Sequence, residues 1–226
     1  TQVIIDRPEV RNALSRAVLD ELKNCFEDLA GNQNLVAVTL SGRGEHCFAA
    51  GGALHQIKQT RDLDDARENA THASSALDAI RNCPVPVYAL LNGDAIGGGA
   101  ELAMACDVRL SARHARFGFA QSTLNIAPAW GGGSDLIRQL GSATAREVMA
   151  SGRLLNAEQA QQAGVVQGLC PVDETFDEYW ADYLRALGER RPQVVRAIKA
   201  LTLAHRRGTS ATTIRALEIE QMAQTW

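Results

Sequence analysis

The sequence predicts an α/β fold followed by a helical C-terminal section. Short segments rich in β-branched residues alternate with amphipathic segments over the first half of the 226 residues, and such alternation is typical of βαβ units. Beyond about Gly118 the strand signals nearly vanish and helical periodicity dominates. Hydrophobic residues make up 46% of the chain and charged residues 22%, which is ordinary for a globular enzyme.

The elements of the first half follow from local chemistry. Strands are expected where Val, Ile and Leu gather, over residues 3–5, 35–40, 85–91 and 108–111. Ser15 carries the short hydroxyl side chain that is favoured at a helix N-cap. A helix is therefore expected through about Leu29, with one apolar face formed by Leu19, Leu22 and Phe26. A second, more charged helix is expected over residues 63–82.

The second half is predicted to be almost entirely helical, over residues 134–140, 143–151, 157–163, 175–187, 192–205 and 211–224. The chain is expected to divide into a core domain, residues 1–190, and a C-terminal helical section, residues 191–226. The boundary after Arg191 is soft, because no flexible linker separates the two parts.

Charge and cysteine usage exclude several classes of protein. The net charge of −3 gives no broad attraction to nucleic acid or to an anionic membrane. The longest apolar runs are far too short to span a bilayer, and we expect no secretory leader, because no charged segment followed by an apolar one is found in residues 1–30. The five cysteines are scattered and lack CxxC spacing, which argues against disulfides or a zinc site. We therefore expect a cytoplasmic protein with no nucleic-acid partner, no membrane contact and no metal.

Residues 92–107 are the most informative segment. Three consecutive glycines, Gly97, Gly98 and Gly99, precede the carboxylate of Glu101 at the start of an expected helix. Glycine lets the backbone approach a ligand closely, and a helix start presents unpaired N–H groups to it. A second small-residue segment, residues 50–52, also follows an expected strand, so the two segments can meet at one edge of a sheet. Donors beside a carboxylate suit a reaction that builds negative charge on a carbonyl oxygen.

Four ordered segments together resemble the crotonase (enoyl-CoA hydratase/isomerase) superfamily. They are residues 7–14 (RPEVRNAL), 48–52 (FAAGG), 92–107, and 117–118 with 128–132 (PAWGG). The resemblance implies a crotonase/ClpP-like spiral of ββα units that binds CoA and substrate, and a C-terminal section that mediates trimerisation. It implies a homotrimer or a dimer of trimers. It also implies an oxyanion hole for an acyl-CoA thioester, made by the N–H groups of Gly52 and Gly98, with CoA entering as part of the substrate and no separate cofactor.

The reaction depends on two positions. Hydratases of this family resemble one another in using two glutamates; the first is present as Glu101, whereas the second position holds Gln121. An amide cannot exchange a proton at neutral pH, so Glu101 is expected to be the single acid/base. Residues 127–132, taken with residues 97–101 and 191–199, also resemble the ethylmalonyl-CoA decarboxylase branch, and (alkyl)malonyl-CoA decarboxylation is one alternative. A non-catalytic CoA-binding protein is the other.

The resemblance also suggests residues for binding. Trp130 and Pro128 are expected to line the acyl pocket together with Gln121. CoA contacts are expected from five positions: Arg11, Ala50, Ala53, His55 and Lys58. Arg11 matches the family arginine near the nucleotide phosphates, and its guanidinium suits them. Ala53 replaces the usual aspartate. Lys199 is expected on a helix surface, with contact to a neighbouring subunit's CoA as the alternative.

Overall fold

The computed structural model describes residues 1–52 and 62–226. Its strands are β1 (Gln2–Ile5), β2 (Val38–Gly42), β3 (Cys47–Ala49), β4 (Val87–Leu91), β5 (Asp94–Ile96), β6 (Val108–Ser111), β7 (Arg116–Gly118), β8 (Leu155–Asn156) and β9 (Gly168–Leu169). Its helices are α1 (Arg16–Ala30), α3 (Leu63–Arg81), α4 (Gly98–Ala105), α5 (Gly132–Ser151), α6 (Ala157–Gln162), α7 (Phe176–Gly188), α8 (Pro192–Arg206) and α9 (Ala211–Thr225). Two 3₁₀ turns cover Pro8–Val10 and Ala120–Leu124.

The strands form two sheets that the chain visits in turn. The first sheet is wholly parallel and has the order β1-β2-β4-β6-β9. The second has the order β3-β5-β7-β8, with β8 antiparallel to β7. From β2 to β7 the chain alternates between the sheets, so that β2, β4 and β6 lie in the first sheet and β3, β5 and β7 lie in the second. This arrangement is the spiral of ββα units that was expected.

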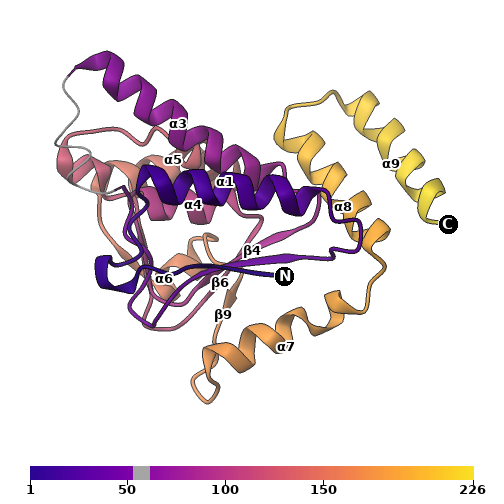
Figure 1. Ribbon diagram of the computed structural model, residues 1–226, viewed down its shortest axis with the longest axis horizontal. Helices are drawn as coiled ribbons and strands as arrows, with labels where there is room; N and C mark the ends of the chain where they lie inside the picture. The colour runs from indigo at the N-terminus through magenta and orange to yellow at the C-terminus, as the bar shows by residue number, and fades with distance from the viewer. Residues whose placement is uncertain (53–61) are drawn as a thin grey trace.

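Helices cover the first sheet and enclose the core. Figure 1 shows α1, α3 and α4 gathered on one face of the central strands. Helix α1 begins after Ser15, whose side chain accepts a hydrogen bond from the Val18 amide, as the sequence predicts. Every residue of α4 is buried, and its small Gly and Ala residues allow the close packing that a central helix needs.

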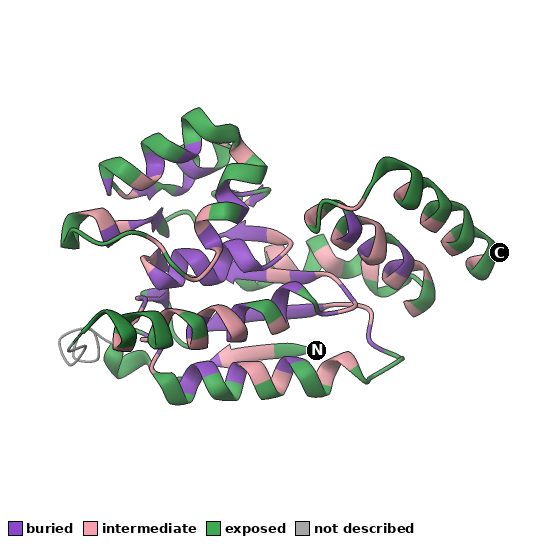
Figure 2. Ribbon diagram, turned by 90° about the horizontal axis from the view of Figure 1, so that it is seen from above, coloured by how far each residue is buried: buried purple, intermediate pink, exposed green. Residues whose placement is uncertain are grey.

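The C-terminal helices extend away from this body. In Figure 2 the buried residues concentrate in the two sheets and the central helices, while α9 is mostly exposed. Helix α8 is held to the core by Lys199, which is only 2% exposed and whose Nζ lies 2.5 Å from Oδ2 of Asp107. The expected surface position of Lys199 is therefore wrong: the ammonium is buried because it pairs with this carboxylate.

No helix in the described part of the chain combines the length and the apolar composition that a membrane-spanning segment needs.

Candidate active site

The two glycine-rich segments lie side by side. Strands β3 and β5 are adjacent and parallel, with Cys47 opposite Asp94 and Ala49 opposite Ala95, so both segments leave the sheet at the same edge. A Cβ atom on Gly51 would stand 2.9 Å from the backbone nitrogen of Gly98. The predicted meeting of the segments at a sheet edge is thus confirmed.

Two backbone N–H groups are available at this meeting point. For Gly52 and Gly98, no acceptor is found among residues 1–52 and 62–226. Gly98 is the first residue of α4, and the first N–H groups of a helix have no partner within it. Both glycines line a cavity of about 670 Å³. These amides can therefore donate to a ligand oxygen, with the positive end of the α4 dipole behind one of them.

The carboxylate of Glu101 lies in the same cavity, at the first turn of α4. It is 1% exposed and accepts four hydrogen bonds. Oε1 accepts from Gln121 Nε2 at 2.9 Å and from the Ala129 amide at 3.3 Å. Oε2 accepts from the amides of Trp130 at 2.8 Å and Gly132 at 3.1 Å. Three of the four donors are backbone groups, so the orientation of the carboxylate is fixed by the loop that precedes α5.

Opposing effects act on the pKa of Glu101. Burial raises the pKa, whereas the hydrogen bonds from Trp130, Ala129, Gly132 and Gln121 lower it, and the net result is a pKa above the ordinary value of 4.5. Desolvation penalises the charged form and so dominates here. A carboxyl group with a raised pKa is well suited to exchanging a proton near neutral pH.

Gln121 is buried next to Glu101 in the 3₁₀ turn that follows β7. Its Nε2 donates to the carboxylate, and its Oε1 has no partner in the described part of the chain. A buried acceptor without a donor is costly. Gln121 lines the cavity but Oε1 itself is buried, so a ligand that donates a hydrogen bond reaches this oxygen when the side-chain amide turns toward the cavity.

Trp130 lines the cavity beside the free amides. Ring atoms of its indole lie close to Gly98 and, at 3.5 Å from a Cβ built on residue 52, close to Gly52. Pro128 does not line the cavity; it packs toward Gly133 of α5, and its neighbours Ala127 and Ala129 take the expected pocket position.

The expected CoA-binding residues lie outside this cavity or outside the described residues. Arg11 has a left-handed backbone conformation, and its half-exposed guanidinium lies 3.5 Å from Asp94. Its carbonyl accepts from the Ala50 amide at 3.1 Å, so Arg11 and Ala50 are neighbours. Ala53, His55 and Lys58 lie outside the described residues. CoA contacts at all five positions stay predictions.

Sequence reasoning missed two groups of residues at the site. The amides of Ala129, Trp130 and Gly132 carry no side-chain signal, so only the fold reveals them. The side of the cavity that α3 forms could have been found from the sequence, because Ala66, Ala70 and Ala73 recur at helical spacing. All three line the cavity. His72 also lines the cavity, and its Nε2 lies 2.6 Å from Oδ1 of Asp20.

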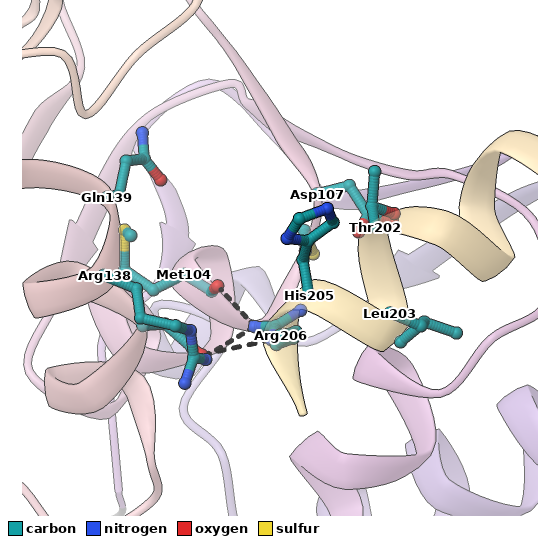
Figure 3. Close-up of a pocket in the computed structure, with 10 residues that line it drawn as sticks. Met104, Asp107, Arg138, Gln139, Thr202, Leu203, His205 and Arg206 are labelled. Carbon is teal, nitrogen blue, oxygen red and sulfur yellow. Dashed lines mark hydrogen bonds and ion pairs between the residues drawn. The ribbon is translucent and has the colours of Figure 1, made fainter. Parts of the chain in front are cut away.

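A second crevice, of about 430 Å³, lies where α8 packs against α4 and α5. Figure 3 shows its polar lining, including Asp107, Gln139 and Arg206. Burial raises the pKa of Cys106 there to about 12, so its thiol stays protonated, as expected for a residue that is not a nucleophile. In the described part of the chain no group of three or more potential metal ligands occurs.

The ββα spiral, with free amides and a buried carboxylate in one cavity, defines a crotonase-fold protein. A family model described as enoyl-CoA hydratase/isomerase matches residues 1–225. The chain therefore belongs to the enoyl-CoA hydratase/isomerase family.

Individual relatives agree with this assignment. The 2,3-dehydroadipyl-CoA hydratase of Escherichia coli is 34% identical over 195 residues, which cover 86% of this chain and 74% of that protein. A short-chain-enoyl-CoA hydratase of Clostridium acetobutylicum is 32% identical, with coverage of 77% and 67%. The crystal structure of an enoyl-CoA hydratase from Bacillus anthracis superposes with a TM-score of 0.90 at 29% identity, covering 98% of this chain and 85% of that one.

Proposed function

We propose that the chain hydrates an enoyl-CoA thioester, with the N–H groups of Gly52 and Gly98 as its oxyanion hole and Glu101 as its single acid/base. Addition of water to the β-carbon generates a thioester enolate. Two fixed donors in a cavity that excludes water stabilise such an oxyanion, and loss of one donor typically costs about 3–4 kcal/mol of barrier.

The proton-transfer role rests on how Glu101 is held. Backbone amides fix the carboxylate, and Gln121 is its one side-chain partner within residues 1–52 and 62–226. When the side-chain amide of Gln121 rotates away, Oε1 of Glu101 keeps only the hydrogen bond from the Ala129 amide, which at 3.3 Å is the longest of the four. Oε1 then takes a proton from the attacking water and returns it to the α-carbon of the enolate, so a single carboxylate completes the addition.

The observation that favours hydration is that Oε1 of Gln121 has no hydrogen-bond donor among the described residues. Water and a β-hydroxyl group can donate to this oxygen, whereas the carboxylate of a malonyl-type thioester cannot. The cavity therefore favours hydration over decarboxylation. The names of two relatives, which denote hydratases, support the same reaction.

The proposal includes an oligomer. Helix α9 buries none of its residues, and the exposed apolar side chains in and after it are Ile219, Met222 and Trp226. Exposed apolar groups on an outlying helix support contact with another copy of the chain. We propose a homotrimer or a dimer of trimers, with CoA bound by Arg11 and Ala50 and by Ala53, His55 and Lys58.

A panel of thioesters tests the reaction. Crotonyl-CoA, a 3-enoyl-CoA and methylmalonyl-CoA are assayed for hydration, double-bond migration and CO2 release, each with wild type, Glu101→Gln and Glu147→Gln. Hydration is expected to fall about 10²–10⁴-fold in Glu101→Gln, with binding of crotonyl-CoA by calorimetry preserved. Glu147 is an exposed glutamate on α5, so its variant is the matched control.

Each other outcome has a defined meaning. CO2 release without hydration would replace the hydratase with a decarboxylase. Binding without turnover of any thioester would make the chain a CoA-binding protein. Hydration that survives in Glu101→Gln would remove Glu101 from the mechanism.

A further inference from the structure

Arg81 connects the end of α3 to the loop that holds Glu101. The arginine is 8% exposed and each of its nitrogens has a separate acceptor. Nε donates to Oδ2 of Asp135 at 2.9 Å, Nη1 to Asp78 at 2.8 Å and Nη2 to the carbonyl of Trp130 at 2.9 Å. The planar guanidinium thus fixes the Trp130 carbonyl relative to two carboxylates.

Trp130 is bound at both ends of its backbone. Its carbonyl accepts from Arg81, and its amide donates to Glu101 Oε2 at 2.8 Å. The Gly132 amide, two residues on, donates to the same oxygen at 3.1 Å. A displacement of the Trp130 peptide groups would therefore move the strongest donor of the carboxylate directly.

Asp135 extends this connection to the C-terminal section. The carboxylate is 5% exposed and also pairs with Arg138 and, at 2.8 Å, with Arg206 of α8. Figure 3 shows Arg206 reaching from α8 to the carbonyl of Met104, in the last turn of α4. One buried carboxylate therefore joins α3, α5 and α8 around the helix that carries Glu101.

We propose that Arg81, oriented by Asp135, is a positioning residue that sets the geometry and proton affinity of Glu101 through the Trp130 peptide, and that Arg206 couples α8 to this arrangement. The inference rests on the proposed role of Glu101 as the acid/base. Among the described residues, the side chain of Arg81 hydrogen-bonds to Asp78, Asp135 and the Trp130 carbonyl and not to Glu101, so it acts through Trp130.

The expected change in Glu101 has a definite sign. The groups that face its carboxylate are the amides of residues 129, 130 and 132 and the Gln121 side chain; no charged side chain of the described residues hydrogen-bonds to it. Amides that bind the ionised form lower its pKa. Losing the Arg81 anchor lengthens these bonds, so the pKa of Glu101 rises further and the acidic limb of the pH–rate profile moves to higher pH.

The first test compares Arg81→Gln with Arg138→Gln. Both variants remove an arginine from Asp135, but in the described part of the chain Arg138 hydrogen-bonds to Asp135 and not to the loop. For Arg81→Gln we expect a fall in kcat of about 10–100-fold, a KM within about threefold of wild type, and the shifted acidic limb. Arg138→Gln should keep the wild-type profile. Equal profiles in the two variants would overturn the proposal.

A second test does not depend on turnover. The Glu101 carboxyl is followed by ¹³C NMR on enzyme labelled at glutamate Cδ, with the Glu101 signal assigned by its loss in Glu101→Gln. The titration midpoint is expected to rise in Arg81→Gln and, by a smaller amount, in Arg206→Gln, whose side chain is more accessible. An unchanged midpoint in both overturns the positioning role, whatever the reaction proves to be.

Should Arg81→Gln fail to fold, Arg81→Lys retains a cation for Asp135 but cannot reach Trp130 and both aspartates together. The Arg81→Lys variant must show the same rise in the titration midpoint of the Glu101 carboxyl. A midpoint equal to that of the wild type would again contradict the proposal.

Discussion

The indole ring of Trp130 occupies the space that a side chain on residue 98 would need. A Cβ atom on Gly98 would collide with Cζ3 and Cη2 of the ring, whereas the same atom on Gly52 would make an ordinary contact at 3.5 Å. Gly98 therefore has two uses: its amide, which has no acceptor among the described residues, is the proposed donor to a ligand, and its missing side chain admits the indole. The wall of the cavity and the proposed oxyanion hole depend on each other at this point.

Gly98→Ala should displace the Trp130 ring and lower kcat/KM by about tenfold or more, because a misplaced pocket wall disturbs substrate orientation. Removing the ring relieves the collision, so the double variant Gly98→Ala, Trp130→Ala should be less impaired than the two single effects predict. A Cβ on Gly188 meets nothing within 4 Å, which makes Gly188→Ala the matched control. Additive effects in kcat/KM would show that the ring does not respond to residue 98.

Glu101 should make the free energy of unfolding depend on pH. The native state holds the Glu101 proton to a higher pH than the unfolded state, because the native pKa lies above 4.5. The stability that this proton contributes is fully present below the unfolded pKa and is lost as pH rises through the native value. Urea unfolding of wild type and Glu101→Gln should therefore give a stability difference that changes across this window and is constant outside it. A constant difference throughout would mean that the native pKa is not raised.

Gln121→Glu should raise or create crotonyl-CoA hydration. The new carboxyl would stand where Nε2 now lies 2.9 Å from Glu101, and two carboxyls at that spacing share a proton, with one apparent pKa raised. We expect the pH optimum of hydration to move upward with the rate. The exposed Gln161 of α6 supplies the control variant Gln161→Glu. No change at all would mean that residue 121 does not face the substrate.

Lys199→Met should destabilise the chain strongly. Asp107 would lose the buried ammonium 2.5 Å away, and breaking a buried pair costs about 3–5 kcal/mol. Lys23→Met removes an exposed lysine whose Nζ lies 4.0 Å from Glu27, for which about 0–1 kcal/mol is expected. Urea denaturation measures the free energy of unfolding of both variants. Similar losses in the two would show that the buried ion pair contributes no more stability than the exposed one.

The sequence predicts the helices better than the second sheet. Helix α1 begins at its expected cap, and α3 and α8 lie within two residues of their expected ranges. Strands β5 and β7 are not predicted from the sequence, because each has only three residues and three residues are too few to show an alternating pattern. The expected strand from residue 35 begins at Val38, since Leu35 is buried without joining the ladder.

The residues of the candidate site also differ in how far the sequence reveals them. Side chains with a distinctive chemistry, such as Glu101 and Trp130, could be selected from the sequence because their neighbours in the chain are unusual. Three of the four donors that hold Glu101 could not, since they are backbone N–H groups of a kind that nearly every residue possesses. Arg81 and Asp135 lie 54 positions apart, and nothing local marks either as part of the same cluster.

Because three of the four donors to the Glu101 carboxylate are peptide N–H groups, a substitution at position 129 or 130 changes the wall of the cavity without deleting a donor. Replacing the indole would enlarge the cavity next to Gly98 and Gly52 while the main chain still orients the proposed acid/base. The size of the cavity thus depends on the side chains of one short segment, and the orientation of the carboxylate depends mainly on its backbone.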